Sequence, residues 1–211
     1  MRLFDALLDL IYPPRCAGCG TRGVRLCADC VARCVPLPPP RRPKALPAGG
    51  PLRRALGIYP FEAVLREAIH TFKYNGERRL AAPLAALLAA HRPFDAAALI
   101  AVPLHPERER ERGFNQAALL AGELSRLWSI PLVGGLVRVR ATDHQVGQNL
   151  RERQHNVSGA FAWAGQDPPP GSVLLIDDVL TTGATLLACA EVLEQAGSTV
   201  VEALTLARAR A

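Results

Sequence analysis

The chain has 211 residues, of which 49% are hydrophobic, and a formal net charge of +6. This length and composition allow one sizeable α/β domain with a small accessory module, and they exclude an intrinsically disordered chain. No apolar run approaches the roughly 18 to 20 residues that a membrane-spanning helix needs.

Arginine supplies nearly all of the positive charge. Only Lys44 and Lys73 among the 25 basic residues are lysines. Such a bias is more typical of genomic base composition than of function, although it also suits anion recognition. A basic balance is compatible with nucleic acid or with phosphorylated metabolites, and it does not choose between them.

The first 14 residues have apolar side chains at helical spacing, interrupted by Asp5 and Asp9. The two acids and the lack of a small-residue cleavage site argue against a signal peptide. We expect a short amphipathic helix that packs on its own domain, with peripheral membrane or partner docking as the alternative. The expected location is cytoplasmic.

Five of the six cysteines lie within nineteen residues near the N-terminus. Two Cys-x2-Cys pairs are formed by Cys16, Cys19, Cys27 and Cys30. Four thiolates complete a tetrahedral shell with no open position, so this spacing predicts a structural zinc site. The alternatives are an iron–sulfur cluster or four unbonded thiols. Cys34 falls outside the spacing and is expected to be a spare thiol.

The chain divides into three parts. Residues 1–35 hold the N-terminal helix and the four-cysteine module, residues 36–51 form a proline-rich linker, and residues 52–211 form a globular domain. Periodicity in that domain predicts helices over 62–73, 77–91, 115–128 and 184–196, and strands over 96–104, 131–140, 159–163, 173–177 and 199–206. A charged loop over 105–114 and a mobile polar segment over 141–158 join some of these elements. Their alternation indicates an α/β fold with an open, mostly parallel sheet.

The stretch VLLIDDVLTTGATL spans residues 173–186. Its acids Asp177 and Asp178 follow a buried strand, and in open α/β sheets ligands bind beyond the carboxyl ends of the strands. Two adjacent carboxylates suit the hydroxyls of a ribose, or a Mg²⁺ held by a ribose and a pyrophosphate.

A hydroxyl-rich turn follows the two acids and begins the helix over 184–196. Its candidate ligand-binding residues are Thr181, Thr182, Gly183, Ala184 and Thr185. Free N–H groups and the dipole of a helix N-terminus favour an anion, and Gly183 permits a close turn. The stretch therefore predicts a site for a ribose that carries a 5′-phosphate. The chain has neither a GxGxxG motif nor a Walker loop, so dinucleotide and nucleoside-triphosphate sites are weak alternatives.

Residues 173–185 resemble the phosphoribosyl pyrophosphate (PRPP) signature of the type I phosphoribosyltransferases. The wider chain resembles the ComF family of competence-related proteins, in the segments FKYNGE (72–77), VPLHPERERERGFNQA (102–117) and TDHQVGQNLRERQHNVSGAF (142–161) and in the Cys-x2-Cys pairs. This resemblance implies the type I phosphoribosyltransferase fold and a zinc module. It also implies a link to natural transformation, the import of single-stranded DNA into the cytosol.

The resemblance implies roles for three further loops. Arg108 and Arg112 match the family pattern and would bind pyrophosphate, with a solvated charge run as the alternative. Lys73 and Tyr74 would either reach the same cleft or lie on the surface. Residues of a flexible loop that closes over PRPP are Thr142, Gln145 and Arg153.

The sequence leaves three functions open. The first is a ComF-like protein that binds PRPP with Mg²⁺ and acts in DNA uptake or in the handling of imported single-stranded DNA. The second is an active phosphoribosyltransferase that transfers the sugar phosphate to a base or another nucleophile. The third is a PRPP-sensing module that binds single-stranded DNA through arginine-rich surfaces.

Overall fold

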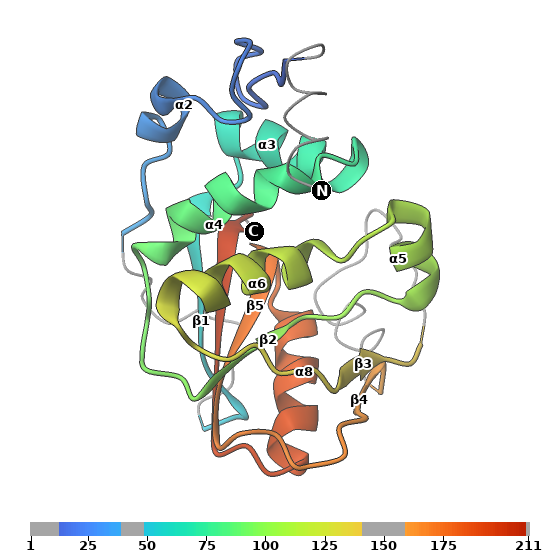
Figure 1. The fold of residues 1–211 in the computed structure, drawn as a ribbon. Helices are drawn as coiled ribbons and strands as arrows, with labels where there is room; N and C mark the ends of the chain where they lie inside the picture. Colours follow the sequence, from blue (N-terminus) through green and yellow to red (C-terminus); the bar gives the residue numbers. More distant parts are fainter. Residues whose placement is uncertain (1–12, 39–48, 141–158, 210–211) are drawn as a thin grey trace.

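Four parallel strands form the central sheet, in the order β1-β6-β5-β2. The computed structural model describes residues 13–38, 49–140 and 159–209 (Figure 1). The elements in chain order are α2 (Ala28–Ala32), β1 (Leu52–Pro60), α3 (Ala63–Tyr74), the 3-10 turn η1 (Arg78–Leu80), α4 (Ala81–Ala89), β2 (Ala98–Ala101), α5 (Pro106–Arg112), α6 (Gln116–Trp128), β3 (Leu136–Arg138), β4 (Phe161–Trp163), β5 (Ser172–Leu180), α8 (Ala184–Gln195) and β6 (Val200–Arg208). The predicted α/β class with a mostly parallel sheet is confirmed.

Helices cover both faces of the sheet. Alternate residues of β5 divide between two buried clusters, because successive side chains of a strand point to opposite faces. Leu174 and Ile176 pack with α3, α4 and α6. Val173 and Leu175 pack with α8 and with Leu136 of β3. In Figure 1 the cysteine-rich segment lies beside α3, at the end of the molecule where β6 ends.

Helix α5 replaces the charged loop expected over 105–114, so that prediction is wrong. His105 is the N-cap and accepts a hydrogen bond from the backbone N–H of Glu107, and Pro106 supplies a preset φ at the first helical position. Gly113 ends the helix in the left-handed region, at a φ of +79°. The sequence did not predict this helix because none of its residues is buried and its charged residues form no apolar stripe.

Strand β1 was not predicted. Its burial alternates only from Ala55 onward, because a register shift between Leu52 and Arg54 disturbs the pattern. Gly57 adds no apolar side chain, and it is needed for close approach to β6. A Cβ at Gly57 would lie 2.6 Å from the Cβ of Arg208.

The strand expected over 131–140 is two separate pieces. Leu132 forms a parallel bridge with Leu99 at the outer edge of β2. Beyond Gly134 and Gly135, β3 pairs antiparallel with β4 in a small second sheet. The helix expected over 77–91 is divided between η1 and α4. The helices expected over 62–73, 115–128 and 184–196 are present within one or two residues of their predicted ends.

Two predicted segments fall at least partly outside the described residues. They are the amphipathic helix over residues 1–14 and the middle of the linker over 36–51. At the start of that linker, the backbone N–H of Leu37 donates to the carbonyl of Ile58 at 2.7 Å. The described start of this segment therefore lies against the free edge of β1.

Candidate functional site

The two acids of the 173–186 motif lie within β5 rather than after it. The strand continues past the expected end at residue 177 and pairs with β6 as far as Leu180. Asp178 therefore follows Leu174 and Ile176 to the face of α3, and Asp177 lies on the face of α8. Adjacent acids in the sequence thus meet different surroundings.

Asp178 forms a buried ion pair with Lys73 at the end of α3. The Lys73 Nζ lies 2.8 Å from the Asp178 Oδ1, and the two side chains are 20% and 5% exposed. The other carboxylate oxygen, Oδ2, is buried and has no hydrogen-bond partner among the described residues. Of the two positions left open by the sequence, Lys73 reaches the acid pair, whereas Tyr74 is 65% exposed.

Asp177 is half-buried and has a raised pKa. Burial, and then the negative charge of Asp178, raise the pKa of Asp177 to about 7. Lys73, the backbone N–H of Asp178 and Arg138 act in the opposite direction. The backbone N–H of Asp178 donates to the Asp177 Oδ1 at 2.8 Å. A group with such a pKa binds cations or hydroxyl donors best when it is ionised.

The threonine-rich turn connects β5 to α8. Gly183 is the N-cap of α8 and has a φ of +82°, a conformation that glycine adopts without strain. The Thr182 Oγ1 accepts from the backbone N–H of Ala184 at 3.4 Å. Thr181 is exposed, and Thr182 and Thr185 are half-buried. The structure therefore brings a helix N-terminus and hydroxyl side chains together directly beyond the two acids.

The two arginines predicted to bind pyrophosphate lie in different surroundings. The Arg112 Nη1 donates to the Gln116 Oε1 at 2.6 Å, and its guanidinium lies over the ring of Tyr74 at 5.3 Å. Arg108 is also half-buried, whereas Arg110 is exposed. Helix α5 thus turns Arg112 toward α3 and α6.

Arg138 is a nearby cation that the sequence did not indicate. Its guanidinium lies over the Phe161 ring at 5.5 Å, across the β3–β4 pair. Burial, and then the charge of Arg108, lower the pKa of Arg138, while Asp177 raises it. A single arginine near the end of a short strand has no sequence signature, so only the fold places it near the acid pair.

The predicted flexible-loop residues Thr142, Gln145 and Arg153 lie outside the described residues. The described residues on either side of that segment are close together. The backbone N–H of Val139 donates to the carbonyl of Ala160 at 2.9 Å, next to the β3–β4 pair. The segment therefore leaves and rejoins the domain at one place, adjoining Arg138.

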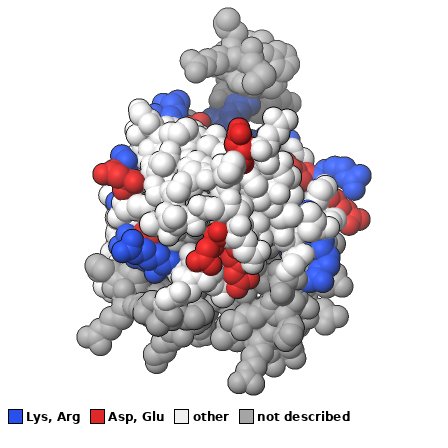
Figure 2. Space-filling view, turned by 90° about the horizontal axis from the view of Figure 1, so that it is seen from below, with Lys and Arg blue, Asp and Glu red and all other residues white. Residues whose placement is uncertain are grey.

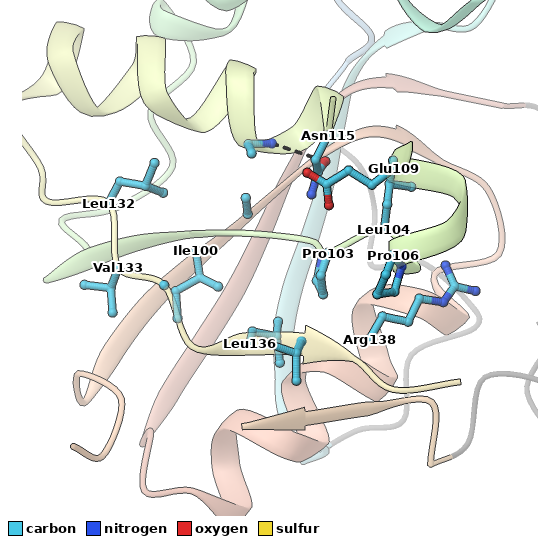
Figure 3. Close-up of a pocket in the computed structure, with 14 residues that line it drawn as sticks. Ile100, Pro103, Leu104, Pro106, Glu109, Asn115, Leu132, Val133, Leu136 and Arg138 are labelled. Carbon is cyan, nitrogen blue, oxygen red and sulfur yellow. Dashed lines mark hydrogen bonds between the residues drawn. The ribbon is translucent and has the colours of Figure 1, made fainter. Parts of the chain in front are cut away.

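A pocket of about 510 Å³ lies at the outer edge of β2, beneath α5. In Figure 3, Leu132 and Val133 lie at one end of it, and Arg138 lies beside Pro106 at the other. Asn115 lines it but is already engaged, because it caps α6 and donates to the Val102 carbonyl at 3.0 Å. None of the acids or turn residues of the 173–186 motif lines this pocket.

The four cysteines of the two Cys-x2-Cys pairs converge. Their sulfur atoms all lie within 4.8 Å of one another, and the sulfurs of Cys19 and Cys27 are 3.6 Å apart. A zinc ion about 2.3 Å from each of four sulfurs would separate them by about 3.8 Å. Burial opposes ionisation of both Cys16 and Cys30; backbone hydrogen bonds, chiefly from Cys27, nevertheless lower the pKa of Cys16 to about 6, whereas the pKa of Cys30 is raised. The cluster therefore fits the predicted structural zinc.

The cysteine module packs on the N-terminal end of α3. Cys16 and Cys30 share a small buried cluster with Val64. A Cβ at Gly18 would lie 2.8 Å from both the Cys30 Sγ and a Val64 methyl carbon, so the Gly18 backbone packs directly against these two side chains. Arg25 adds an ion pair to Glu77, with Nε and Oε1 3.2 Å apart. The same helix thus contacts the module at one end and Asp178 near the other.

Cys34 does not belong to the cluster. Its Sγ donates to the Cys30 carbonyl at 3.3 Å, and burial raises its pKa.

In the ranges that the structure describes, every helix is too short or too polar to cross a bilayer.

Comparison with known proteins places the chain in a family. A model of the phosphoribosyl transferase domain matches residues 114–211, which include β5, the turn and α8. The DNA utilization protein YhgH of Salmonella typhimurium is 30% identical over 206 residues, which cover 92% of this chain and 83% of that protein. Competence protein ComFC of Bacillus subtilis is 29% identical over 162 residues, which cover 74% of this chain and 65% of that protein. The chain belongs to the ComF family.

A third relative matches only part of this ComF-family chain. Competence protein F of Haemophilus influenzae is 40% identical over 115 residues, which cover 53% of this chain and 50% of that protein. The match thus spans half the length of that relative. The ComF-family chain therefore combines a phosphoribosyltransferase-type domain with a four-cysteine cluster, as its sequence predicts.

Proposed function

We propose that this ComF-family protein binds PRPP at the carboxyl end of β5. The observation that carries the proposal is the acid pair Asp177 and Asp178 directly before a helix N-terminus rich in hydroxyl groups. The acids would accept from the ribose hydroxyls, directly or through Mg²⁺. The 5′-phosphate would bind the N–H and hydroxyl groups of Thr181, Thr182, Gly183, Ala184 and Thr185.

The pyrophosphate of PRPP would bind on the side of α3 and α5. Arg112 lies between Tyr74 and Gln116, and a planar guanidinium binds an oxyanion with two parallel hydrogen bonds. Arg108 would approach from the same helix. Thr142, Gln145 and Arg153 would close over the ligand, exclude water and bring a cation to the pyrophosphate.

The cellular role that we propose is the uptake or handling of DNA. The names of the relatives, competence protein and DNA utilization protein, support this role. In this role the protein would act in the cytoplasm on imported single-stranded DNA or on proteins of the uptake machinery. The phosphoribosyl ligand would then report on, or supply, nucleotide metabolism.

Isothermal titration of the zinc-loaded protein with PRPP and Mg²⁺ tests the ligand proposal. We expect saturable binding that the double variant Asp177→Ala/Asp178→Ala loses. A matched control is Glu191→Ala, which removes an exposed acid from α8 outside the turn. Absence of binding by the unaltered protein, or equal binding by the double variant, would contradict the proposal.

Sugar transfer is a second candidate function. It is favoured by the match to a phosphoribosyl transferase domain over residues 114–211. The zinc-loaded protein would then release pyrophosphate from PRPP when it is offered the correct nucleobase or other nucleophile. If PRPP binds but no member of a nucleobase panel causes release, base salvage is rejected and the binding proposal stands.

Direct binding of single-stranded DNA is a third candidate function. The net positive charge does not by itself show which surface would bind the DNA. Figure 2 shows the face of the molecule opposite the cysteine module, where described basic and acidic side chains alternate at the margin and leave an uncharged centre. A phosphate-binding surface would instead gather cations. We therefore expect any such binding to use another face, and to weaken steeply as salt is raised.

A further inference from the structure

Lys73 is held at the carboxyl end of the sheet by its ion pair with the buried Asp178. Taking a carboxylate out of water is unfavourable, and one ammonium group offsets this only when the other lone pairs are also satisfied. Here the Asp178 Oδ2 is buried with no hydrogen-bond partner among the described residues. An incomplete ion pair of this kind indicates a ligand that completes it.

The ammonium group of Lys73 can donate further hydrogen bonds beyond its ion pair with Asp178. It carries three N–H groups, and its ion pair among the described residues is with the Asp178 Oδ1 at 2.8 Å. The Lys73 side chain is 20% exposed, four times the 5% of Asp178, so it forms the outer part of the pair. An incoming anion would meet Lys73 before it meets Asp178.

The position of Lys73 determines which phosphate group of the ligand it can reach. The turn that we propose for the 5′-phosphate begins α8, and α8 packs on the face of the sheet that Asp177 shares. Lys73 comes from α3 on the opposite face, and its neighbour Tyr74 lies against Arg112 at 5.3 Å. The end of α3 and the end of α5 thus bring two cations to one side of the site.

We infer that Lys73 is a ligand-binding residue that contacts the pyrophosphate of the phosphoribosyl ligand, and that Asp178 positions it for this contact. The inference rests on the proposed PRPP function and deepens it. Asp178 fixes one face of the ammonium, and the remaining N–H groups point to the ligand's oxygens. A ribose hydroxyl beside the pyrophosphate would donate to the Asp178 Oδ2. One ligand then satisfies both members of the pair.

Titration with three ligands distinguishes the Lys73 contact from the other contacts of the site. The ligands are PRPP with Mg²⁺, inorganic pyrophosphate with Mg²⁺, and ribose 5-phosphate. For Lys73→Met we expect the affinity for PRPP and for pyrophosphate to fall about tenfold or more, since a charge-assisted hydrogen bond is lost. The affinity for ribose 5-phosphate should change by less than about threefold, because its phosphate binds at α8. The matched control is Arg66→Met, an exposed cation on the same helix.

A second variant guards against misfolding. Lys73→Met leaves a buried acid without a counter-ion and lowers stability. Lys73→Met/Asp178→Asn removes both charges, and thermal unfolding should show recovery toward the midpoint of the unaltered protein while pyrophosphate affinity stays low. Recovery of folding together with normal pyrophosphate affinity would overturn the inference.

The outcomes distinguish the two proposals. If the unaltered protein binds none of the three ligands, the PRPP function fails, and the inference fails with it. If the unaltered protein binds PRPP and a folded Lys73→Met variant binds it equally well, only the inference fails. An equal loss for all three ligands would also contradict it, because Lys73 would then not select the pyrophosphate.

Discussion

Asp177 and Asp178 are neighbours in the chain, yet each has a different partner. Asp178 faces α3 and is paired with Lys73, whereas Asp177 faces α8 and has a pKa raised to about 7 by burial and by its neighbour. The ionisation of Asp177 in the folded protein therefore occurs near neutral pH rather than near its usual value of 3.8. Protonation of Asp177 should therefore affect both the stability of the protein and its affinity for the ligand.

The sign of the effect on stability follows from the direction of the shift. Because the pKa of Asp177 is higher in the folded than in the unfolded protein, its contribution to stability is fully present below about pH 4. That contribution is lost as the pH rises through about 7. Ligand binding has the opposite dependence, since a ribose hydroxyl or Mg²⁺ prefers the ionised carboxylate.

Titration with PRPP and Mg²⁺ at several pH values tests this residue. We expect the dissociation constant to fall about tenfold between pH 6 and pH 8, as one group with a pKa near 7 loses its proton. In Asp177→Asn the affinity should be lower, and only the ligand's own titration should remain. A pH dependence that is the same in both proteins would show that Asp177 does not titrate at the site.

At the scale of elements, long segments with regular apolar spacing were predictable, and short segments without it were not. The ends of α6 and α8 match their expected bounds because their apolar spacing is regular and their starts carry recognisable residues, Asn115 and Gly183. Helix α5 has no buried residue, so its sequence lacks a helical apolar stripe. The motif 173–186 identified the acids and the turn, and the sequence left open whether Lys73 reaches them from α3, but nothing indicated that Arg138 approaches them from β3. Such contacts depend on the packing of distant segments.

Asn115 connects α6 to β2 and thereby supports the start of the α5 segment. Its Oδ1 accepts from the backbone N–H groups of Ala117 and Ala118, and its Nδ2 donates to the Val102 carbonyl. Asn115 is therefore the N-cap of α6.

We expect Asn115→Ala to lower the free energy of unfolding by about 2 kcal/mol, through the lost cap and the unpartnered carbonyl. Urea denaturation measures this change. Asn115→Ser is the control, because it keeps a capping oxygen and should lose about half as much. Equal stability of all three proteins would show that these hydrogen bonds do not support the fold.

At the scale of the whole molecule, the cysteine module and the proposed ligand site share one helix. The module packs on Val64 near the start of α3, and Lys73 lies near the end of that helix. Loss of the metal should therefore reduce stability and also loosen the wall of the ligand site. The spacing of the cysteines predicted the cluster, but nothing in the sequence indicated that it would pack on this helix.

Metal analysis and calorimetry test the module. We expect about one zinc per chain, and we expect Cys30→Ser to lower both zinc content and the unfolding temperature. Cys34→Ser is the control, since Cys34 lies outside the cluster and donates only to a carbonyl. Full zinc content in Cys30→Ser, or an equal loss in Cys34→Ser, would show that the four-cysteine assignment is wrong.

A crystal structure of the zinc-loaded protein with PRPP and Mg²⁺ tests the central claim most directly. The account predicts the 5′-phosphate at the N-terminus of α8, with Asp177 beside the ribose and Lys73 within hydrogen-bond distance of the pyrophosphate. A ligand bound elsewhere, for example in the pocket between α5 and β3, would contradict it.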